Sequence, residues 1–155
     1  MSFMLKIFSM LLLLLLGCSS QEKNIYIESP DKNISVKIFK QDSDFIYNVN
    51  FNGKRIIQDS KVGLIFKNGY EFPSYHNVKK VEKGFHKDTW ELPWGEKKVV
   101  KDIYNEIKIS LTDTNNLETG MMLFRAYDDG IAFRYQMNDN NKDQDSLIII
   151  NELTE

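Results

Sequence analysis

Residues 45–53 read Phe-Ile-Tyr-Asn-Val-Asn-Phe-Asn-Gly, and this stretch decides the fold class. Up to position 51 two sets of residues alternate, Phe45, Tyr47, Val49 and Phe51 in one and Ile46, Asn48 and Asn50 in the other. A period of two is typical of a strand with one buried face. Asn52-Gly53 follows directly, and these residues readily adopt the positive φ that a type I′ turn needs at both positions. The stretch therefore predicts a β-hairpin whose second strand covers 54–58.

The same period recurs along the rest of the chain. In its longest case, 99–111, one face holds Ile103, Asn105, Ile107, Ile109 and Leu111. Asp128-Asp129-Gly130 marks another tight hairpin. In all, strands are predicted at 34–38, 45–51, 54–58, 62–66, 78–85, 99–111, 121–127, 131–137 and 147–150. No helical period holds for three turns after Cys18, so the chain is predicted to be all-β, folded as an antiparallel β-sandwich.

The N-terminal residues resemble a targeting segment. Lys6 precedes an apolar run, 7–16, that is too short to span a bilayer, because a spanning helix needs about 20 apolar residues. The run fits the core of a signal peptide, and Leu15-Leu16-Gly17-Cys18 resembles the bacterial lipobox. We therefore predict a signal peptide over 1–17, a lipid on Cys18, and export to a bacterial membrane, on its periplasmic side or at the cell surface. The alternative is an ordinary secretory signal with an incidental cysteine.

Composition argues against several classes of function. Lys and Arg total 20 against 22 Asp and Glu, so the net charge of −2 gives no basis for binding nucleic acid. Two histidines and one cysteine leave little material for a zinc site. With its single cysteine lipidated, the mature chain has no internal disulfide to form. Its stability is therefore expected to come from burial of an apolar core.

The most unusual cluster is Trp90-Glu91-Leu92-Pro93-Trp94-Gly95-Glu96. A tryptophan face suits the apolar C–H face of a sugar ring. Trp90 and Trp94 are therefore candidate carbohydrate contacts, with Glu96 as a polar neighbour. The alternative is a loop held to the sandwich by two aromatic anchors, and the spacing leaves both interpretations open.

Tyr104-Asn105-Glu106 lies within the longest predicted strand. Asn105 falls on the apolar face of that strand, where an amide without hydrogen-bond partners costs roughly 1–3 kcal/mol. Asn105 is therefore expected to bond a neighbouring backbone group or, alternatively, to support a ligand or a partner domain. Glu106 on the opposite face is a second candidate contact.

Phe124 to Tyr135 forms the third cluster. With Asp129-Gly130 as a two-residue loop, Arg125 would lie directly opposite Arg134. Like charges in that position destabilise a sheet, so this register predicts a carboxylate between them, from Glu96 or Glu106. The cluster is then either an ion-pair network on a sheet face or an arginine that orients a carboxylate at a domain interface.

Paired carboxylates can indicate glycoside hydrolysis, which needs two carboxyl groups roughly 5–9.5 Å apart. Sequence separation does not show that distance, so Glu91, Glu96 and Glu106 are weak candidates and no catalytic residue is assigned. His76 and His86 are expected in loops or at the surface, because nothing couples them to a Ser or Cys nucleophile. No metal ligand is assigned.

These clusters together resemble the N-terminal domain of glycoside hydrolase family 97, the α-glucosidases and α-galactosidases common in Bacteroidetes. The matching pieces occur in the family's order from about Ile25 to Glu155. They are Ser29-Pro30-Asp31, Asn52-Gly53-Lys54, Val62-Gly63-Leu64, Trp90 to Glu96, Tyr104-Asn105-Glu106 and Phe124 to Tyr135.

The resemblance implies an enzyme of three parts: an N-terminal β-super-sandwich of the galactose-mutarotase-like type, a (β/α)₈ catalytic barrel and a small C-terminal β domain. It also implies calcium near the active site and hydrolysis of α-linked glucosides or galactosides, with inversion or retention. The family's catalytic carboxylates lie in the barrel, and the calcium-binding glutamate of its N-terminal domain is placed beyond residue 155. No catalytic, metal-binding or cofactor-binding residue is therefore carried over to this chain.

Length limits what this chain is expected to do. A (β/α)₈ barrel takes about 250 residues, more than the 155 present. Residues 25–155 are therefore expected to form an incomplete N-terminal β-sandwich, joined by a tether over 18–24 to its lipid and inactive alone. Because the chain stops within or just after a strand, uncovered strand edges predict poor solubility.

The expected partners follow from this organisation. They are a catalytic barrel in the same or a separately encoded chain, an α-linked oligosaccharide, and the membrane through the lipid anchor, but not nucleic acid. The alternative is a free-standing carbohydrate-binding lipoprotein that uses Trp90 and Trp94 as its platform.

Overall fold

The computed structural model describes residues 24–94, 98–138 and 147–154, and these residues form strands and turns without any helix. The strands are β1 (Ile25–Glu28), β2 (Ile34–Gln41), β3 (Asp44–Phe51), β4 (Lys54–Val62), β5 (Leu64–Phe66), β6 (Glu71–Phe72), β7 (Asn77–Glu91), β8 (Val99–Thr112), β9 (Glu118–Ala126), β10 (Ile131–Met137) and β11 (Ile149–Glu152). The predicted all-β class is confirmed. The predicted signal peptide and the lipidation site Cys18 lie outside the described residues.

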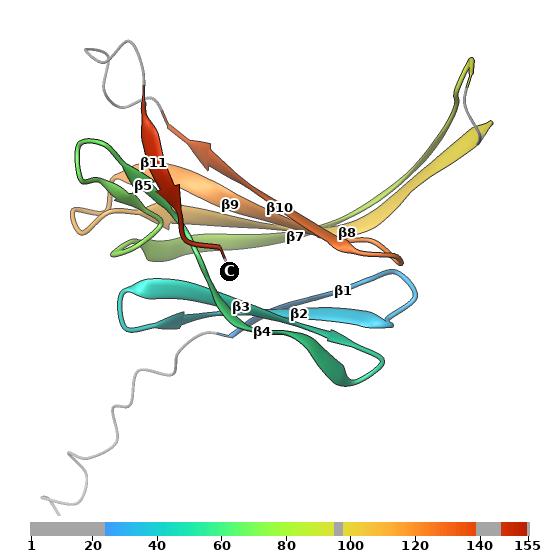
Figure 1. Cartoon of the computed structure of the whole chain (residues 1–155), viewed down its shortest axis with the longest axis horizontal. Helices are drawn as coiled ribbons and strands as arrows, with labels where there is room; N and C mark the ends of the chain where they lie inside the picture. The colour runs from blue at the N-terminus through green and yellow to red at the C-terminus, as the bar shows by residue number, and fades with distance from the viewer. Residues whose placement is uncertain (1–23, 95–97, 139–146, 155) are drawn as a thin grey trace, which may run out of the picture.

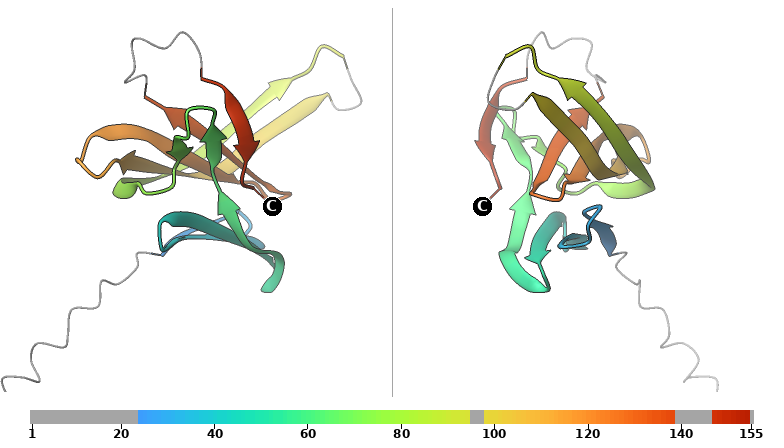
Figure 2. Two further views of the ribbon diagram at one scale, coloured as in Figure 1. Left: turned by 60° about the vertical axis from the view of Figure 1, so that its left-hand side comes forward. Right: turned by 90° about the vertical axis from the view of Figure 1, so that its right-hand side faces the viewer.

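The strands form two facing four-stranded sheets and a small third sheet. The first sheet has the order β1-β2-β3-β4, the second β10-β9-β8-β7, and the third β11-β5-β6. Neighbouring strands run antiparallel throughout. Figure 1 shows the two larger sheets as layers of a sandwich, and Figure 2 shows the small sheet at one side of it. The predicted antiparallel β-sandwich is therefore confirmed.

The core lies between the two larger sheets. Alternate residues of β2, β3, β8 and β9 point inward, as the period-two pattern predicts. The aromatic ring of Tyr47 crosses the interface, with its centroid 6.2 Å from Phe124 and 5.7 Å from Phe133. The buried apolar set is Ile25, Ile27, Ile34, Val36, Ile38, Phe45, Tyr47, Val49, Val62, Leu64, Phe66, Phe72, Ile107, Ile109, Leu111, Met122, Phe124 and Ala126.

The hairpin at 45–53 forms as predicted. Phe51 pairs with Lys54, so Asn52-Gly53 is the two-residue loop. Asn52 has a φ of 49° and Gly53 a φ of 77°. Both values lie in the left-handed region that a type I′ turn requires.

The predicted register of the β9–β10 hairpin is wrong by two residues. Ile131, and not Phe133, pairs with Ala126, and Phe133 pairs with Phe124. The tip of the turn is shifted by one position: the amide of Tyr127 donates to the carbonyl oxygen of Gly130, which leaves Asp128-Asp129, and not Asp129-Gly130, between them. This register stacks the rings of Phe124 and Phe133, with centroids 5.4 Å apart.

The corrected register also separates the two arginines. Arg125 lies opposite Ala132, and Arg134 lies opposite Leu123. Direct apposition of like charges, which would destabilise the sheet, is thereby avoided. A shift of two residues leaves every side chain on its original face, so both arginines still point to the same side.

Strands β7 and β8 extend far beyond the rest of their sheet. Pairing continues from Asn77↔Thr112 out to Glu91↔Val99, whereas β9 stops pairing with β8 at Asn105↔Ala126. Residues 85–94 and 98–105 therefore form a two-stranded projection, here called the arm, which rises away from the sandwich in Figure 1. The strand predicted over 78–85 is therefore too short, because β7 continues to Glu91.

Candidate functional site

The outer face of the sheet β10-β9-β8-β7 gathers most of the predicted site residues. Ile107 and Ile109 point into the core, so Glu106 and its neighbours at even positions of β8 point outward. Arg125 pairs with Glu106 and lies on the same face. Cross-strand pairing and alternation place Trp90, on the arm, and Arg134, on β10, on this face too. Trp94 lies beyond the end of β7, and Glu96 is outside the described residues.

Arg125 is held between a carboxylate and an aromatic ring. Its Nε donates to Glu106 Oε2 at 2.8 Å, and its guanidinium carbon lies 4.3 Å from the centroid of the Tyr104 ring. Glu106 Oε1 lies 3.3 Å from Lys108 Nζ. Glu106 is therefore the carboxylate that was expected beside an arginine.

Tyr104 is buried although it belongs to the outer face. His86 stacks on its ring at 4.8 Å, and Tyr127 lies 5.0 Å from it on another side. His86 Nε2 is in turn 3.4 Å from Asp102 Oδ2. Tyr104, His86, Tyr127 and Asp102 form a packed polar and aromatic cluster at the base of the arm. This packing fixes the position of the arm where it leaves the sandwich.

Charge pairing changes the titration of the central ion pair. Partial burial acts to raise the pKa of Glu106, but hydrogen bonds from Arg125 and Lys108 outweigh it and hold that pKa below its usual value. The hydrogen bond to Glu106 raises the pKa of Arg125. Both groups are therefore charged at neutral pH.

Glu106→Gln is expected to lower the free energy of unfolding by about 1 kcal/mol at pH 7, because a neutral amide bonds the partly exposed Arg125 more weakly. The folded-state pKa of Glu106 is depressed, so its stabilisation is complete above the unfolded pKa of about 4.3 and is lost as pH falls through the folded pKa. Urea denaturation between pH 7 and pH 2 measures the difference in the free energy of unfolding between the variant and the unaltered chain, which should shrink as pH falls below about 4.3. A difference that stays constant down to pH 2 contradicts the assignment. Glu82→Gln is the matched control, since Glu82 pairs with Lys80 in an exposed position.

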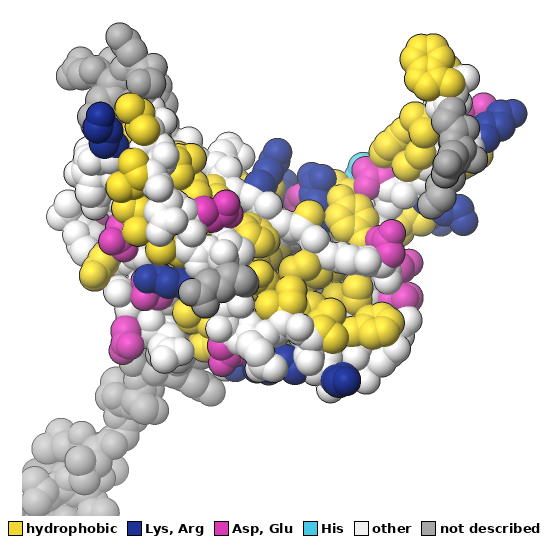
Figure 3. All heavy atoms as spheres, viewed as in Figure 1, with side chains coloured by type: hydrophobic (Ala, Val, Ile, Leu, Met, Phe, Trp, Pro, Cys, Tyr) yellow, Lys and Arg dark blue, Asp and Glu magenta, His cyan; other side chains and the backbone are white. Residues whose placement is uncertain are grey.

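The arm displays aromatic and aliphatic side chains to solvent. Trp94 is 83% exposed, and Trp90, Leu92 and Val99 are each roughly half exposed. The interpretation of Trp90 and Trp94 as anchors that hold a loop to the sandwich is therefore wrong. Figure 3 shows a broad hollow between the arm and the rest of the molecule, with apolar side chains on the arm beside it.

A small cavity of about 110 Å³ lies on the outer face, lined by Arg125, Arg134, Leu123 and Tyr127 among others. Arg134 is exposed. The two arginines thus border one depression without facing each other directly. This arrangement suits a partner that brings a carboxylate or a backbone carbonyl to the face.

Asn105 has a structural role within the sandwich. Its Nδ2 donates to the carbonyl oxygen of Glu28 at 2.7 Å, which joins β8 to β1 across the two sheets. The prediction that this amide finds a neighbouring backbone partner is confirmed.

His76 lies in a loop, one of the two positions expected for it, but its side chain is buried there at 4% exposure. It lies beside a pocket that the sequence did not indicate, together with Tyr70 and Asp113. These residues come from separate turns, so no local pattern joined them.

The described residues contain no group of three or more His, Cys, Asp and Glu side chains that could hold a metal ion. None of the described residues belongs to a helix long and apolar enough to cross a membrane.

Comparison with known protein families identifies the chain. The family model described as Glycosyl-hydrolase 97 N-terminal matches residues 27–155. The chain belongs to glycoside hydrolase family 97. The matched part is the family's N-terminal domain, which agrees with the sandwich described above.

Individual family 97 proteins show the same likeness. The chain is 26% identical over 133 residues to a retaining α-galactosidase of Bacteroides thetaiotaomicron, covering 85% of this chain and 19% of that protein. It superposes on a family 97 enzyme of Pseudoalteromonas sp. strain K8 in complex with panose, with a TM-score of 0.74 and 29% identity, covering 84% of this chain and 20% of that one. The chain thus spans about a fifth of the length of these relatives.

A further structure shares the fold alone. A β-arabinopyranosidase superposes with a TM-score of 0.73 and 19% identity, covering 85% of this chain and 21% of that one. The sandwich is therefore shared with an enzyme of a different named activity, and the fold by itself does not indicate a substrate.

Proposed function

We propose that this chain is the non-catalytic N-terminal part of a family 97 glycosidase, and that a (β/α)₈ catalytic barrel covers its outer face and arm. The observation that carries the proposal is the arm, whose aromatic side chains the described chain leaves exposed. The barrel belongs to the same or to a separately encoded chain. Its substrates are α-linked glucosides or galactosides, a class that agrees with the α-galactosidase relative.

Physical considerations support a covered arm. A two-stranded ribbon is marginally stable by itself in water, and contiguous exposed apolar surface marks interaction sites. Trp, Tyr and Arg are the residue types that dominate binding energy at protein interfaces. Trp90 and Trp94 on the arm and Arg134 on the outer face supply two of these types, and all three are exposed.

The full chain is expected to release no p-nitrophenol from p-nitrophenyl α-glucoside or α-galactoside, with or without calcium. A separately expressed (β/α)₈ barrel of the family should co-purify with it. The Trp90→Ala/Trp94→Ala double variant should weaken that association about tenfold, as expected for interface residues worth about 1.4 kcal/mol.

Tyr75→Gly is the matched control for the association, because Tyr75 is an exposed aromatic residue just before β7, at the end of that strand opposite the arm. Turnover by the full chain alone contradicts the non-catalytic role. Failure of the barrel to associate, or association unchanged in the double variant, contradicts docking on the arm.

Membrane anchoring through a lipid on Cys18 is part of the same proposal, and it rests on the lipobox-like sequence Leu15-Leu16-Gly17-Cys18. The anchor would hold the sandwich at the membrane through the short tether. Fractionation of cells that express Cys18→Ser tests it, since loss of the lipid should move the chain out of the membrane fraction.

A second candidate function is that of a free-standing carbohydrate-binding lipoprotein. The 83% exposure of Trp94 favours it, because an exposed indole can stack on a sugar ring. Glycan binding that disappears in Trp94→Ala would support this function over barrel docking.

A further inference from the structure

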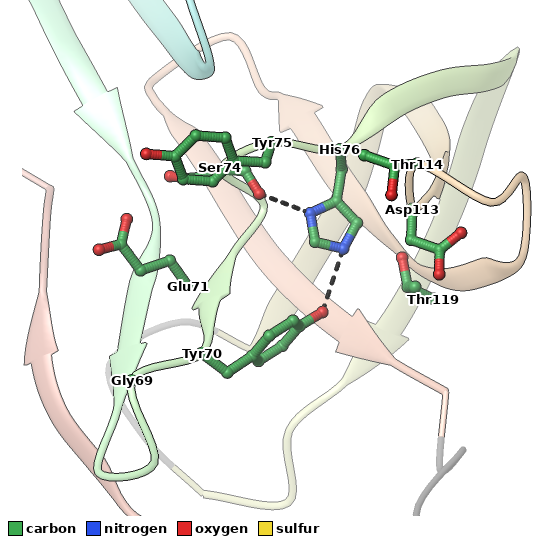
Figure 4. A pocket seen from close by; sticks show the side chains of 9 residues that line it. All are labelled: Gly69, Tyr70, Glu71, Ser74, Tyr75, His76, Asp113, Thr114 and Thr119. Carbon is green, nitrogen blue, oxygen red and sulfur yellow. Dashed lines mark hydrogen bonds between the residues drawn. The ribbon is translucent and has the colours of Figure 1, made fainter.

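A pocket of about 550 Å³ lies at the end of the sandwich opposite the arm. Three separate segments form it: the β5–β6 turn, the loop that follows β6, and the β8–β9 turn with the start of β9. Figure 4 shows His76 between Tyr70 on one side and Asp113 and Thr119 on the other. The lining residues are Gly69, Tyr70, Glu71, Ser74, Tyr75, His76, Asp113, Thr114 and Thr119. The volume lies in the range typical of small-molecule sites.

The polar wall of the pocket is preorganised. His76 Nδ1 lies 2.7 Å from the carbonyl oxygen of Ser74, which can only accept, so Nδ1 carries a proton. In the neutral ring Nε2 then accepts from the hydroxyl of Tyr70 at 3.1 Å. Both rings are thereby oriented before any ligand arrives, which lowers the entropic cost of binding.

Tyr75 offers an aromatic face at the pocket. It is 67% exposed and has a φ of 65°, a conformation that is unusual for a bulky residue and is found at ligand sites. The amide of Tyr75 donates to the carbonyl oxygen of Ser43 at 2.9 Å, and Ser74 Oγ donates to Asp44 Oδ1 at 2.9 Å. The β2–β3 turn therefore holds the loop in this conformation.

The charge of the lining restricts the ligand. Glu71 and Asp113 line the pocket, and no Lys or Arg is among its described lining residues. Asp113 Oδ1 accepts from the amides of Asn115 and Leu117, whereas Oδ2 takes no hydrogen bond from the described residues and remains an acceptor. These two carboxylates disfavour an anion, although Lys40 Nζ donates to the carbonyl oxygen of His76 at 2.8 Å from outside the lining, and the described residues provide no metal-binding group.

We propose that this pocket binds a neutral pyranose. The C–H face of the sugar packs on the Tyr75 ring, and its hydroxyl groups donate to the carboxylates of Asp113 and Glu71. Ser74, Thr114 and Thr119 add hydroxyl groups that both donate and accept, which matches a ring bearing several hydroxyls. The proposal goes beyond barrel docking and does not depend on it, because the pocket and the arm lie at opposite ends of the sandwich.

Saturation-transfer difference NMR on the full chain tests the pocket with methyl α-glucopyranoside, methyl α-galactopyranoside and inorganic phosphate. At least one sugar should bind, with a dissociation constant on the order of 1 mM, and phosphate should not. Tyr75→Gly should weaken sugar binding about tenfold or more, whereas Tyr75→Phe, which keeps the ring face, should change it by less than about threefold.

Glycine adopts the φ of residue 75 without strain, so the melting temperature of Tyr75→Gly should not fall. Lost binding would then report the missing ring and not unfolding. Tyr26→Ala is the matched control and should bind as the unaltered chain does. Absence of sugar binding, binding of phosphate, or sugar binding that is unchanged in Tyr75→Gly overturns the proposal. Loss of binding in Trp94→Ala also overturns it, because the sugar would then lie on the arm.

Discussion

Phe124→Ala is expected to lower the free energy of unfolding by about 3–5 kcal/mol, among the largest effects of any substitution in this chain. Phe124 is 1% exposed and lies between the two sheets. Its ring meets Tyr47 at 6.2 Å and Phe133 at 5.4 Å. Truncation removes these contacts and leaves a cavity that strands fixed by ladder hydrogen bonds cannot readily fill.

Phe85→Ala is the matched control for this prediction. Phe85 belongs to β7 but is 62% exposed on the arm, so its loss should change stability by less than about 0.5 kcal/mol. Urea denaturation followed by circular dichroism measures both variants. A similar loss in the two variants would show that the arm is as tightly packed as the core and would contradict the fold described here.

Gly120→Ala is expected to lower the free energy of unfolding by about 1–3 kcal/mol or more. A Cβ at this position in β9 would press against the carbonyl oxygen of Gln136 and lie 3.0 Å from Cα of Met137. Both groups are backbone of β10, so relief requires that strand to move away from β9. Overpacking of this kind typically costs 1–3 kcal/mol. Movement of β10, the edge strand of its sheet, would also weaken its hydrogen bonds to β9.

Gly84→Ala is its matched control, because Gly84 also lies in a strand of the same sheet but has no atom within 4 Å of the added Cβ. Glycine weakens a strand relative to alanine, so this variant should be neutral or slightly stabilised. Thermal denaturation of both variants checks the prediction. Equal melting temperatures for Gly120→Ala and the unaltered chain would contradict the close approach of β9 and β10.

Several parts of the fold follow from local pattern. The alternation at 45–51 and the Asn52-Gly53 turn predict a hairpin that forms with the expected dihedral angles. The face of each residue was also predictable, because parity survives the two-residue error in the β9–β10 register. This is why Glu106, Arg125 and Arg134 were correctly assigned to one face while the direct partners of the arginines were not.

The arm was harder to foresee. Both of its faces are largely exposed, so β7 lacks the alternation of apolar and polar residues by which a half-buried strand is recognised. Trp90 and the proline at position 93 favoured an irregular loop. Pairing with β8, which has a clear pattern in its inner half, carries the strand out to Glu91.

By itself, the sequence determined the strand class, the first hairpin and the side of the sheet to which each candidate residue points. These properties depend on the period of two and on turn residues, which act between neighbours along the chain. Only the tertiary structure decided that Tyr70, His76 and Asp113 share one pocket, and that Trp90 stands on an arm beside a hollow. Such proximity depends on how the sheets pack on each other and on where one strand extends beyond the strand it pairs with. A segment of a few residues determines neither the packing nor the strand ends.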